Sequence, residues 1–261
     1  MARRTSIGDR LNRFAETGCE DWSLRSALPD QPRESVHLWR VLLDRIPADH
    51  FCLSADEAAR AGKSVFPQHR HRFSAMRSVL RHVLGGYAQA SPDSFTFLYG
   101  AKGKPSLPGD QNRLDLRFNV SHSGGLGIIS VASGREVGVD VETRGEIVDY
   151  MALARRFFSP REHQALAALP QELGQKAFLR CWARKEAYIK ALGAGLSCPL
   201  RSFAVSVSPE LSSDVLLETS SAASHHVSDV ALPDECVAAL AIEGGTLPRC
   251  CWTYTPKPVL S

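Results

Sequence analysis

The stretch from Gly138 to Glu142 (GVDVE) constrains the fold more than any other, because its valines and carboxylates alternate strictly. In an extended strand, residues two positions apart point to the same side. The two valines therefore point into a hydrophobic core, whereas Asp140 and Glu142 share the opposite face. The sequence predicts a strand that borders a core on one side and carries an acidic pair on the other.

The acidic pair is the first candidate for a functional site. Two carboxylates side by side disfavour each other's ionisation, and a hard cation between them removes that cost. Oxygen ligands select magnesium or calcium over softer metals. A solvated strand face with ion-pair partners is the alternative, since Arg135 and Arg144 are close in the sequence. The pair on its own favours this second interpretation.

A long helix is predicted over about residues 175–192, where apolar residues recur at helical spacing and Gly193 supplies the end. Lys185 falls within the apolar stripe, and a lysine there must snorkel or meet an anion. Glu186 and Lys190 lie along the edge of the stripe, one turn apart, where a plain ion pair is one interpretation. A third carboxylate with two ammonium groups also suits magnesium-assisted cleavage of a pyrophosphate, in which positive charge stabilises the leaving phosphate.

Three further segments carry groups that suit an anion. The loop KGKP (102–105) holds two lysines beside a glycine that lets the backbone approach a ligand closely. The turn NVSHSGG (119–125) is rich in small donors, and its His122 is a candidate donor to a phosphate. The basic run at residues 69–72, with Arg77 and Arg81 behind it, suits a terminal phosphate. Ordinary surface turns and a solvated helix face are the alternatives for all three.

Helices and strands alternate along the rest of the chain. A helix is predicted within residues 68–90 and ended by Gly85 and Gly86, and another opens at Ser159 in a capping box with Glu162. The other expected segments are a structured run at 38–46, strands at 95–100 (FTFLYG), 116–123, 126–132, 137–142, 200–207 (LRSFAVSV) and 236–242, a helix at 149–158, and a loop or hairpin tip at 220–229 (SSAASHHVSD).

These elements predict three parts. Residues 1–36 are polar and rich in turn formers, and we expect a leader there. Residues 37–133 would form an N-terminal lobe, and residues 134–261 a C-terminal lobe that carries the acidic strand.

The composition argues against several classes of protein. Seven cysteines, an odd number without a C-x-x-C pair, disfavour a disulfide framework or a structural zinc site. Cys250 and Cys251 fit apolar positions near a C-terminal strand better than a reactive pair. A net charge of +3 does not by itself indicate a nucleic-acid partner. Without a membrane-spanning run or a signal peptide, we expect a cytoplasmic monomer bound to neither membrane nor nucleic acid.

Five motifs follow one another in the chain: GKP (103–105), NVSHSG (119–124), VGVDVE (137–142), RFFSPRE (156–162) and WARKEAYIKALGAGLS (182–197). In this order they resemble those of the 4′-phosphopantetheinyl transferases. The resemblance runs from about Arg70 to Gly244, and the size and spacing are similar to the longer, two-lobed (Sfp-type) class that activates surfactin-type peptide synthetases. It implies an α+β fold of two pseudo-symmetric lobes with the active site in the cleft between them. The third and the last of the five motifs are highly specific as a pair.

The resemblance also implies a role for each candidate residue. Asp140, Glu142 and Glu186 would hold Mg²⁺, with Mn²⁺ as a substitute, against the pyrophosphate of coenzyme A. Glu186, or a water on the metal, would take the proton from the carrier serine. Lys190 would steady the departing adenosine 3′,5′-bisphosphate, and Lys185 would assist at the phosphates. The residues expected to bind coenzyme A are Lys102, Lys104, Pro105, Asn119, Ser121, His122, Arg70 and Arg77.

The implied activity is that of a magnesium-dependent holo-[carrier protein] synthase. It would move phosphopantetheine from coenzyme A to a serine of an apo acyl, polyketide or peptidyl carrier protein, and the fatty-acid, polyketide and nonribosomal peptide pathways all stay open. A metal-dependent phosphohydrolase or nuclease uses similar carboxylates, although a nuclease needs a broader basic surface. A non-catalytic coenzyme A binder needs neither Glu186 nor Lys190. The leader, the loop around His225 and His226, and the two adjacent cysteines have no assigned role.

Overall fold

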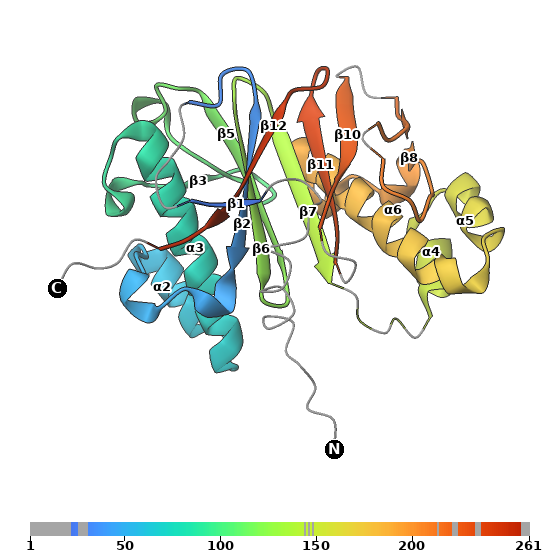
Figure 1. The fold of residues 1–261 in the computed structure, drawn as a ribbon, viewed down its shortest axis with the longest axis horizontal. Coiled ribbons are helices and arrows are strands. Elements are labelled where there is room, and N and C mark those ends of the chain that lie inside the picture. The colour runs from blue at the N-terminus through green and yellow to red at the C-terminus, as the bar shows by residue number, and fades with distance from the viewer. Residues whose placement is uncertain are drawn as a thin grey trace.

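Two β-sheets lie in the middle of the molecule, and helices flank them on both sides (Figure 1). The structure is a computed structural model that describes residues 22–25, 31–143, 145, 147, 149–212, 214–220, 224–232 and 236–256. Helices and strands are mixed in both halves, which confirms the predicted α+β class.

The first sheet has five strands in the order β1-β12-β2-β6-β5. β12 runs parallel to both of its neighbours, and the remaining pairs are antiparallel. The predicted division at residue 133 assigns β12 to the C-terminal lobe and β1 to the leader, whereas both strands belong to this sheet. The strands are β1 (Ser23–Arg25), β12 (Arg249–Tyr254), β2 (Val36–Leu42), β6 (Leu126–Ser133) and β5 (Leu116–Ser123).

The helix α3 (Pro67–Ala88) packs on this sheet, and α2 (Ala55–Gly62) lies beside it. The predicted end at Gly85 and Gly86 is wrong, because the helix continues to Ala88 and ends at Gln89, which has a φ of 53°. A Cβ at Gly85 would lie 2.8 Å from the carbonyl oxygen of Ala90, so this glycine lets the chain that follows the helix pack closely against its last turn. The shared core includes Trp39, Val41, Val79, Leu80, Val83, Leu84, Phe118, Ile129 and Val131.

The second sheet has three antiparallel strands, and the long helix α6 (Gln171–Ala191) packs on it. A Cβ at Gly138 would lie 2.1 Å from the carbonyl oxygen of Ala187, so the glycine lets α6 lie directly against β7. This close approach brings the helix to the strand that carries Asp140. The strands are β10 (His225–Val230), β11 (Cys236–Glu243) and β7 (Val137–Thr143).

Two short helices, α4 (Tyr150–Phe157) and α5 (Pro160–Ala167), precede α6. The capping box predicted for α5 is confirmed. The hydroxyl of Ser159 accepts a hydrogen bond from the Glu162 N–H (3.3 Å), and the Glu162 carboxylate accepts one from the Ser159 N–H (2.7 Å). These bonds satisfy donors that the first turn of a helix leaves free.

The segment predicted as a loop or hairpin tip at 220–229 differs from the structure. Residues 225–229 belong to β10, which pairs with β11 over its whole length, and residues 221–223 lie outside the described residues. β10 is an edge strand of its sheet, yet its polar residues Ser228 and Asp229 are buried, and Asp229 is paired with Arg184. The polar composition of this segment therefore led to the prediction of a loop where the structure has a strand.

Short elements complete the described fold. The predicted strands FTFLYG and LRSFAVSV contribute two residues each, and no described helix is long and apolar enough to cross a membrane. The two-residue strands are β3 (Leu98–Tyr99) paired with β4 (Pro105–Ser106), and β8 (Ala204–Val205) paired with β9 (Leu217–Glu218). Single 3₁₀ turns lie at Leu43–Arg45, Ala48–His50, Pro92–Ser94, Gly109–Gln111, Gly195–Ser197 and Leu200–Ser202.

The two sheets are joined through side chains along β5 and β7. These strands belong to different sheets, yet polar side chains of β5 reach the backbone of β7. The three side chains are two positions apart, so they share one side of the strand. The Val139 N–H donates to Asn119 Oδ1 (3.1 Å), the Val141 N–H to Ser121 Oγ (3.4 Å) and the Thr143 N–H to Ser123 Oγ (3.1 Å).

Candidate active site

Asp140 lies at the centre of the predicted site, on β7, with 4% of its surface exposed. Its Oδ1 accepts hydrogen bonds from Lys190 Nζ (2.6 Å) and Ser121 Oγ (2.9 Å). Its Oδ2 is buried, and no described group is hydrogen-bonded to it. An unpaired buried acceptor costs about 1–3 kcal/mol, and more when it is charged. This oxygen is therefore well suited to a cation.

Lys190 reaches Asp140 from the last turn of α6. Among the described residues its ion pair is with Asp140, across to the neighbouring strand, and not with Glu186 one turn earlier on the helix. The ammonium also donates to Ser121 Oγ (3.0 Å). The plain ion pair along the helix, one of the two interpretations of the sequence, is thus replaced by a contact within the predicted site.

The three candidate carboxylates lie close enough to influence one another. Burial raises the pKa of Glu142 to about 7, and the negative charge of Asp140 adds to this effect. Burial and the charge of Asp140 also raise the pKa of Glu186. Burial raises the pKa of Asp140 itself, against the opposing effect of the Lys190 ammonium. The site therefore favours added positive charge, whether as protons or as a cation.

The donor set fits a hard divalent cation, because all of its ligand atoms are carboxylate oxygens. The unpaired Oδ2 of Asp140 and the raised pKa values of Glu142 and Glu186 support this fit. Within the described part of the chain, no group of three or more His, Cys, Asp or Glu side chains is arranged as a metal site. The fit therefore concerns charge and ligand chemistry, and the ligands are not gathered into a preformed cage.

A cavity of about 370 Å³ opens beside Glu186 and Lys190, between α3, the loop before β4, β5 and the end of α6. Its volume falls in the range of small-molecule sites. The predicted site residues that line it are Arg77, Lys102, Lys104, Pro105, Asn119, His122, Glu186 and Lys190. The cavity is also lined by Gly103 of the KGKP loop, and the remaining lining residues are Arg60, Phe73, Met76, Tyr99, Val120, Ile189, Gly193 and Gly195.

The two lysines of the GKP loop have different surroundings. Lys102 is exposed at the cavity wall. Lys104 donates to Glu136 Oε2 (2.7 Å) and to the backbone carbonyls of Val137 (3.1 Å) and Ala191 (2.9 Å). An ammonium has three protons, so all of the donors of Lys104 are used within the protein. Lys104 thereby fastens the loop to the start of β7 and the end of α6.

His122 lies among positive charges at the cavity wall. Desolvation of the ring lowers its pKa, followed by the charges of Lys190 and Arg72. Arg72 projects from α3 and forms a two-bonded ion pair with Asp44 (2.7 and 2.8 Å). The arginines predicted from the sequence were Arg70 and Arg77. The basic run at residues 69–72 indicated a positively charged segment of the helix, but helical spacing alone did not show that Arg72 is the member beside His122.

The two predicted arginines have other partners, whereas the charge of Arg72 contributes to the lowered pKa of His122. Arg70 is exposed and donates to the carbonyl oxygen of Ser64 (3.1 Å), and neither Arg70 nor Arg72 lines the cavity. Arg77 lines the cavity but is buried, with bonds to Glu57 (2.6 Å) and the Tyr99 hydroxyl (2.8 Å). Its guanidinium therefore stabilises the contact between α2 and α3 and positions Tyr99 at the cavity wall.

Lys185 lies away from the cavity. Its side chain is fully buried, and its Nζ binds both oxygens of Glu162 (2.6 and 2.8 Å) and the carbonyl of Phe203 (2.8 Å). The lysine in the apolar stripe thus meets an anion, and the anion is the capping glutamate of α5. The structure does not bring Lys185 to the three carboxylates.

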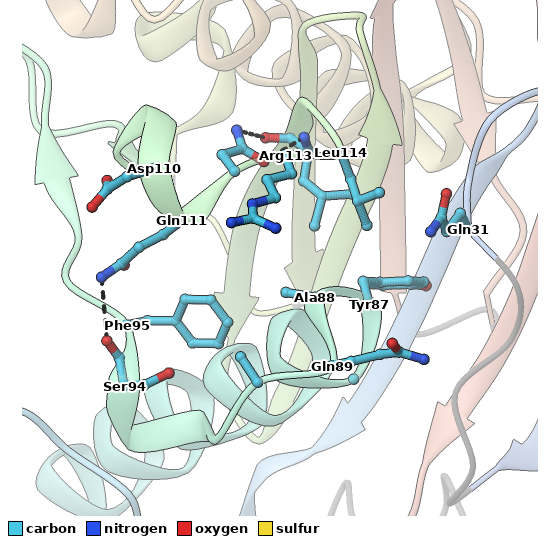
Figure 2. Close-up of a pocket in the computed structure, with 14 residues that line it drawn as sticks. Gln31, Tyr87, Ala88, Gln89, Ser94, Phe95, Asp110, Gln111, Arg113 and Leu114 are labelled. Atoms are coloured by element: carbon cyan, nitrogen blue, oxygen red, sulfur yellow. Dashed lines mark hydrogen bonds between the residues drawn. The ribbon is translucent and has the colours of Figure 1, made fainter.

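A second and larger cavity, of about 760 Å³, lies at the far end of α3 (Figure 2). It is bounded by the end of that helix and by residues 110–114, with the ring of Phe95 and the side chain of Arg113 pointing into it. None of the predicted site residues lines it. The chemistry expected from the sequence therefore belongs to the smaller cavity beside Lys190.

Comparison with known proteins places this arrangement in a family. The model of the 4′-phosphopantetheinyl transferase superfamily matches residues 136–241, which include Asp140, Glu142, Glu186 and Lys190. The chain is 40% identical over 227 residues to the 4′-phosphopantetheinyl transferase HetI of Nostoc sp., covering 85% of this chain and 93% of that protein. It is 32% identical over 165 residues to the 4′-phosphopantetheinyl transferase Sfp of Bacillus subtilis, covering 59% and 71%.

A solved structure with a related name is also similar. It is a holo-(acyl-carrier-protein) synthase from Bacillus anthracis, with a TM-score of 0.36 and 20% identity over 42% of this chain and 96% of that one. The similarity to HetI over nearly its whole length defines the class. The chain belongs to the 4′-phosphopantetheinyl transferase superfamily. It is an enzyme of the Sfp-like type that transfers phosphopantetheine from coenzyme A to a carrier protein.

Proposed function

We propose that the transfer depends on magnesium and that the cavity beside Lys190 binds the nucleotide end of coenzyme A. The observation that carries this proposal is the buried, unpaired Oδ2 of Asp140, next to an ammonium that borders the cavity. Asp140, Glu142 and Glu186 would hold Mg²⁺ or Mn²⁺, which would neutralise negative charge on the pyrophosphate.

The proposed reaction is a single displacement. The oxygen of the carrier serine forms a bond to the phosphorus that bears the pantetheine arm, and the bond from that phosphorus to the bridging oxygen breaks. The products are holo carrier and adenosine 3′,5′-bisphosphate. Glu186 lines the cavity, and burial raises its pKa, which makes it a stronger base toward the serine proton than an exposed glutamate. Lys190 would donate to the phosphate oxygens and stabilise the charge on the leaving nucleotide.

The remaining lining residues would bind and orient coenzyme A. Lys102 and His122 border the cavity, and Arg72 adds positive charge beside His122. We assign Lys104 a supporting role, because its three donors already hold the loop against β7 and α6. We assign Lys185 a similar role, since its buried pair with Glu162 fastens the catalytic helix to α5.

The partner and cellular setting stay predictions. An acyl, polyketide or peptidyl carrier fits the family equally well, and the enzyme is expected to act as a cytoplasmic monomer.

A transfer assay tests the proposed function directly. The protein is incubated with coenzyme A, Mg²⁺ and one apo carrier of each kind, and intact carriers are weighed by mass spectrometry. We expect at least one carrier to gain the mass of phosphopantetheine, with equimolar adenosine 3′,5′-bisphosphate. Free phosphopantetheine without a carrier gain would identify a hydrolase, and coenzyme A binding without any product would identify a binder. Either result would overturn the proposal.

A further inference from the structure

Two serines of β5 bind the two carboxylates of β7 from the opposite sheet. Ser121 Oγ donates to Asp140 Oδ1 (2.9 Å), and Ser123 Oγ donates to Glu142 Oε2 (3.3 Å). The serines are two positions apart, as the carboxylates are, so each strand presents its pair on one side. The same contact is therefore made twice along the junction between the two halves of the molecule.

Each serine hydroxyl is also fixed by bonds that it accepts. Ser121 accepts from the Val141 N–H (3.4 Å) and from Lys190 Nζ (3.0 Å). Ser123 accepts from the Thr143 N–H (3.1 Å) and lies 3.0 Å from the Thr143 hydroxyl. A hydroxyl has one hydrogen and two lone pairs. With both lone pairs of Ser121 engaged, its hydrogen is directed to Asp140, and the hydrogen of Ser123 is directed to Glu142 when the Thr143 hydroxyl donates to Ser123.

We infer that Ser121 and Ser123 are positioning residues, each of which orients one carboxylate of β7 for the metal ion. This inference rests on the proposed metal site. Groups that hydrogen-bond a metal-binding carboxylate restrict its rotamers and raise the affinity of the site. Because the serines belong to one sheet and the carboxylates to the other, contact between the two halves of the molecule sets the affinity for the metal. The resemblance assigned Ser121 to coenzyme A, but its single hydrogen is already given to Asp140.

Metal binding in the absence of coenzyme A and carrier tests the inference. Binding of Mn²⁺ is measured by electron paramagnetic resonance of the free ion. Ser123→Ala removes the hydroxyl and should weaken Mn²⁺ binding about tenfold. Ser123→Thr keeps the hydroxyl and should bind within about twofold of the unmodified enzyme. The matched control is Ser133→Ala on β6, whose hydroxyl donates to the carbonyl of Leu114 (2.6 Å) outside the site.

Two further variants keep the result interpretable. Ser123→Cys retains most of the volume with a weak donor and should bind Mn²⁺ as poorly as the alanine variant. Thermal melts establish that each variant is folded. Mn²⁺ binding that survives Asp140→Ala would show that the proposed metal site itself is wrong. If Asp140→Ala abolishes binding while folded Ser123→Ala and Ser123→Cys bind normally, only the positioning inference is wrong.

Discussion

Lys190 Nζ lies 2.6 Å from Asp140 Oδ1, and this ion pair joins the end of α6 to β7. The carboxylate is almost fully buried, whereas the lysine side chain is 28% exposed and borders the cavity. The lysine therefore compensates a buried charge on one side and presents positive charge to a ligand on the other. Both roles depend on the close approach of helix and strand at Gly138.

Lys190→Ala should lower kcat by about a hundredfold or more, because a donor to the leaving phosphate acts at the barrier. Coenzyme A should still bind, since Lys102 and His122 continue to line the cavity. The measurement is kcat at saturating coenzyme A and apo carrier, with a thermal melt of each protein. Lys176→Ala, on the same helix, is the matched control and should keep normal turnover. A folded Lys190→Ala enzyme with nearly normal kcat would remove this lysine from the mechanism.

Metal removal should abolish transfer, and added Mg²⁺ or Mn²⁺ should restore it. Asp140→Asn keeps the shape of the side chain but removes its charge, so turnover at low Mg²⁺ should fall by about a hundredfold. Asp115→Asn is a suitable control, because Asp115 is an exposed carboxylate that pairs with Arg117. The initial rate is followed as Mg²⁺ is titrated. A chelator-treated enzyme that retains full activity would contradict the metal assignment.

Lys185→Met should destabilise the fold and leave the chemistry of the surviving enzyme intact. Loss of one partner from a buried ion pair leaves an uncompensated charge, here on Glu162, and costs about 3–5 kcal/mol. The second substitution Glu162→Gln should recover part of this loss, because glutamine carries no charge and still accepts the N–H of Val205. Denaturant unfolding gives the stability, and kcat is measured on folded protein. A large fall in kcat without a change in stability would restore Lys185 to the active site.

Local patterns were enough to predict the elements that carry the site. The alternation of GVDVE predicted β7, the apolar stripe predicted α6, and the sequence from Ser159 to Glu162 predicted the capping box. Each of these features depends on neighbours within a few residues. The resemblance to a family then supplied the fold class and the activity, which the comparison with HetI supports.

Contacts between distant segments could not be predicted in this way. Glu162 is 23 positions from Lys185, and nothing in the helical pattern names it as the partner. β12 comes from the last part of the chain yet lies between β1 and β2. Its pairing with both strands is parallel, and parallel strands are not joined by a short turn that a local sequence pattern could reveal. Arg72 differs from Arg70 only in which side of α3 it occupies. The partner of each cation is thus a property of the tertiary structure.

His122→Ala and Arg72→Ala should each raise the KM for coenzyme A about tenfold with little change in kcat, because contacts to the nucleotide exist before and after the barrier. Arg70→Ala is the matched control on the same helix and should leave KM within about twofold. Steady-state rates over a range of coenzyme A concentrations separate the three variants. An effect of Arg70→Ala larger than that of Arg72→Ala would reverse the assignment of the arginines.

A pair of stacked histidines predicts how stability depends on pH. The rings of His50 and His82 are stacked, 4.1 Å apart, and His82 Nε2 lies 3.3 Å from the carbonyl of His50. His50 Nε2 also lies 2.7 Å from the hydroxyl of Tyr254 on β12. Burial lowers the pKa of both histidines, and the charge of His82 lowers that of His50 further. The folded state therefore favours the neutral rings.

The contribution of this pair to stability should consequently fall as the pH is lowered below about 6.5, the ordinary pKa of histidine, because these two side chains take up protons more readily in the unfolded chain than in the folded one. The loss continues until the pH reaches the lowered pKa values of the folded state. His82→Gln keeps a donor for the His50 carbonyl but removes one titrating group, so its melting temperature should change less between about pH 7.5 and pH 5.5. His163→Gln, on α5, is the control and should follow the unmodified enzyme. Thermal melts at both pH values provide the measurement, and an equal fall in all three proteins would show that the stacked pair does not set this dependence.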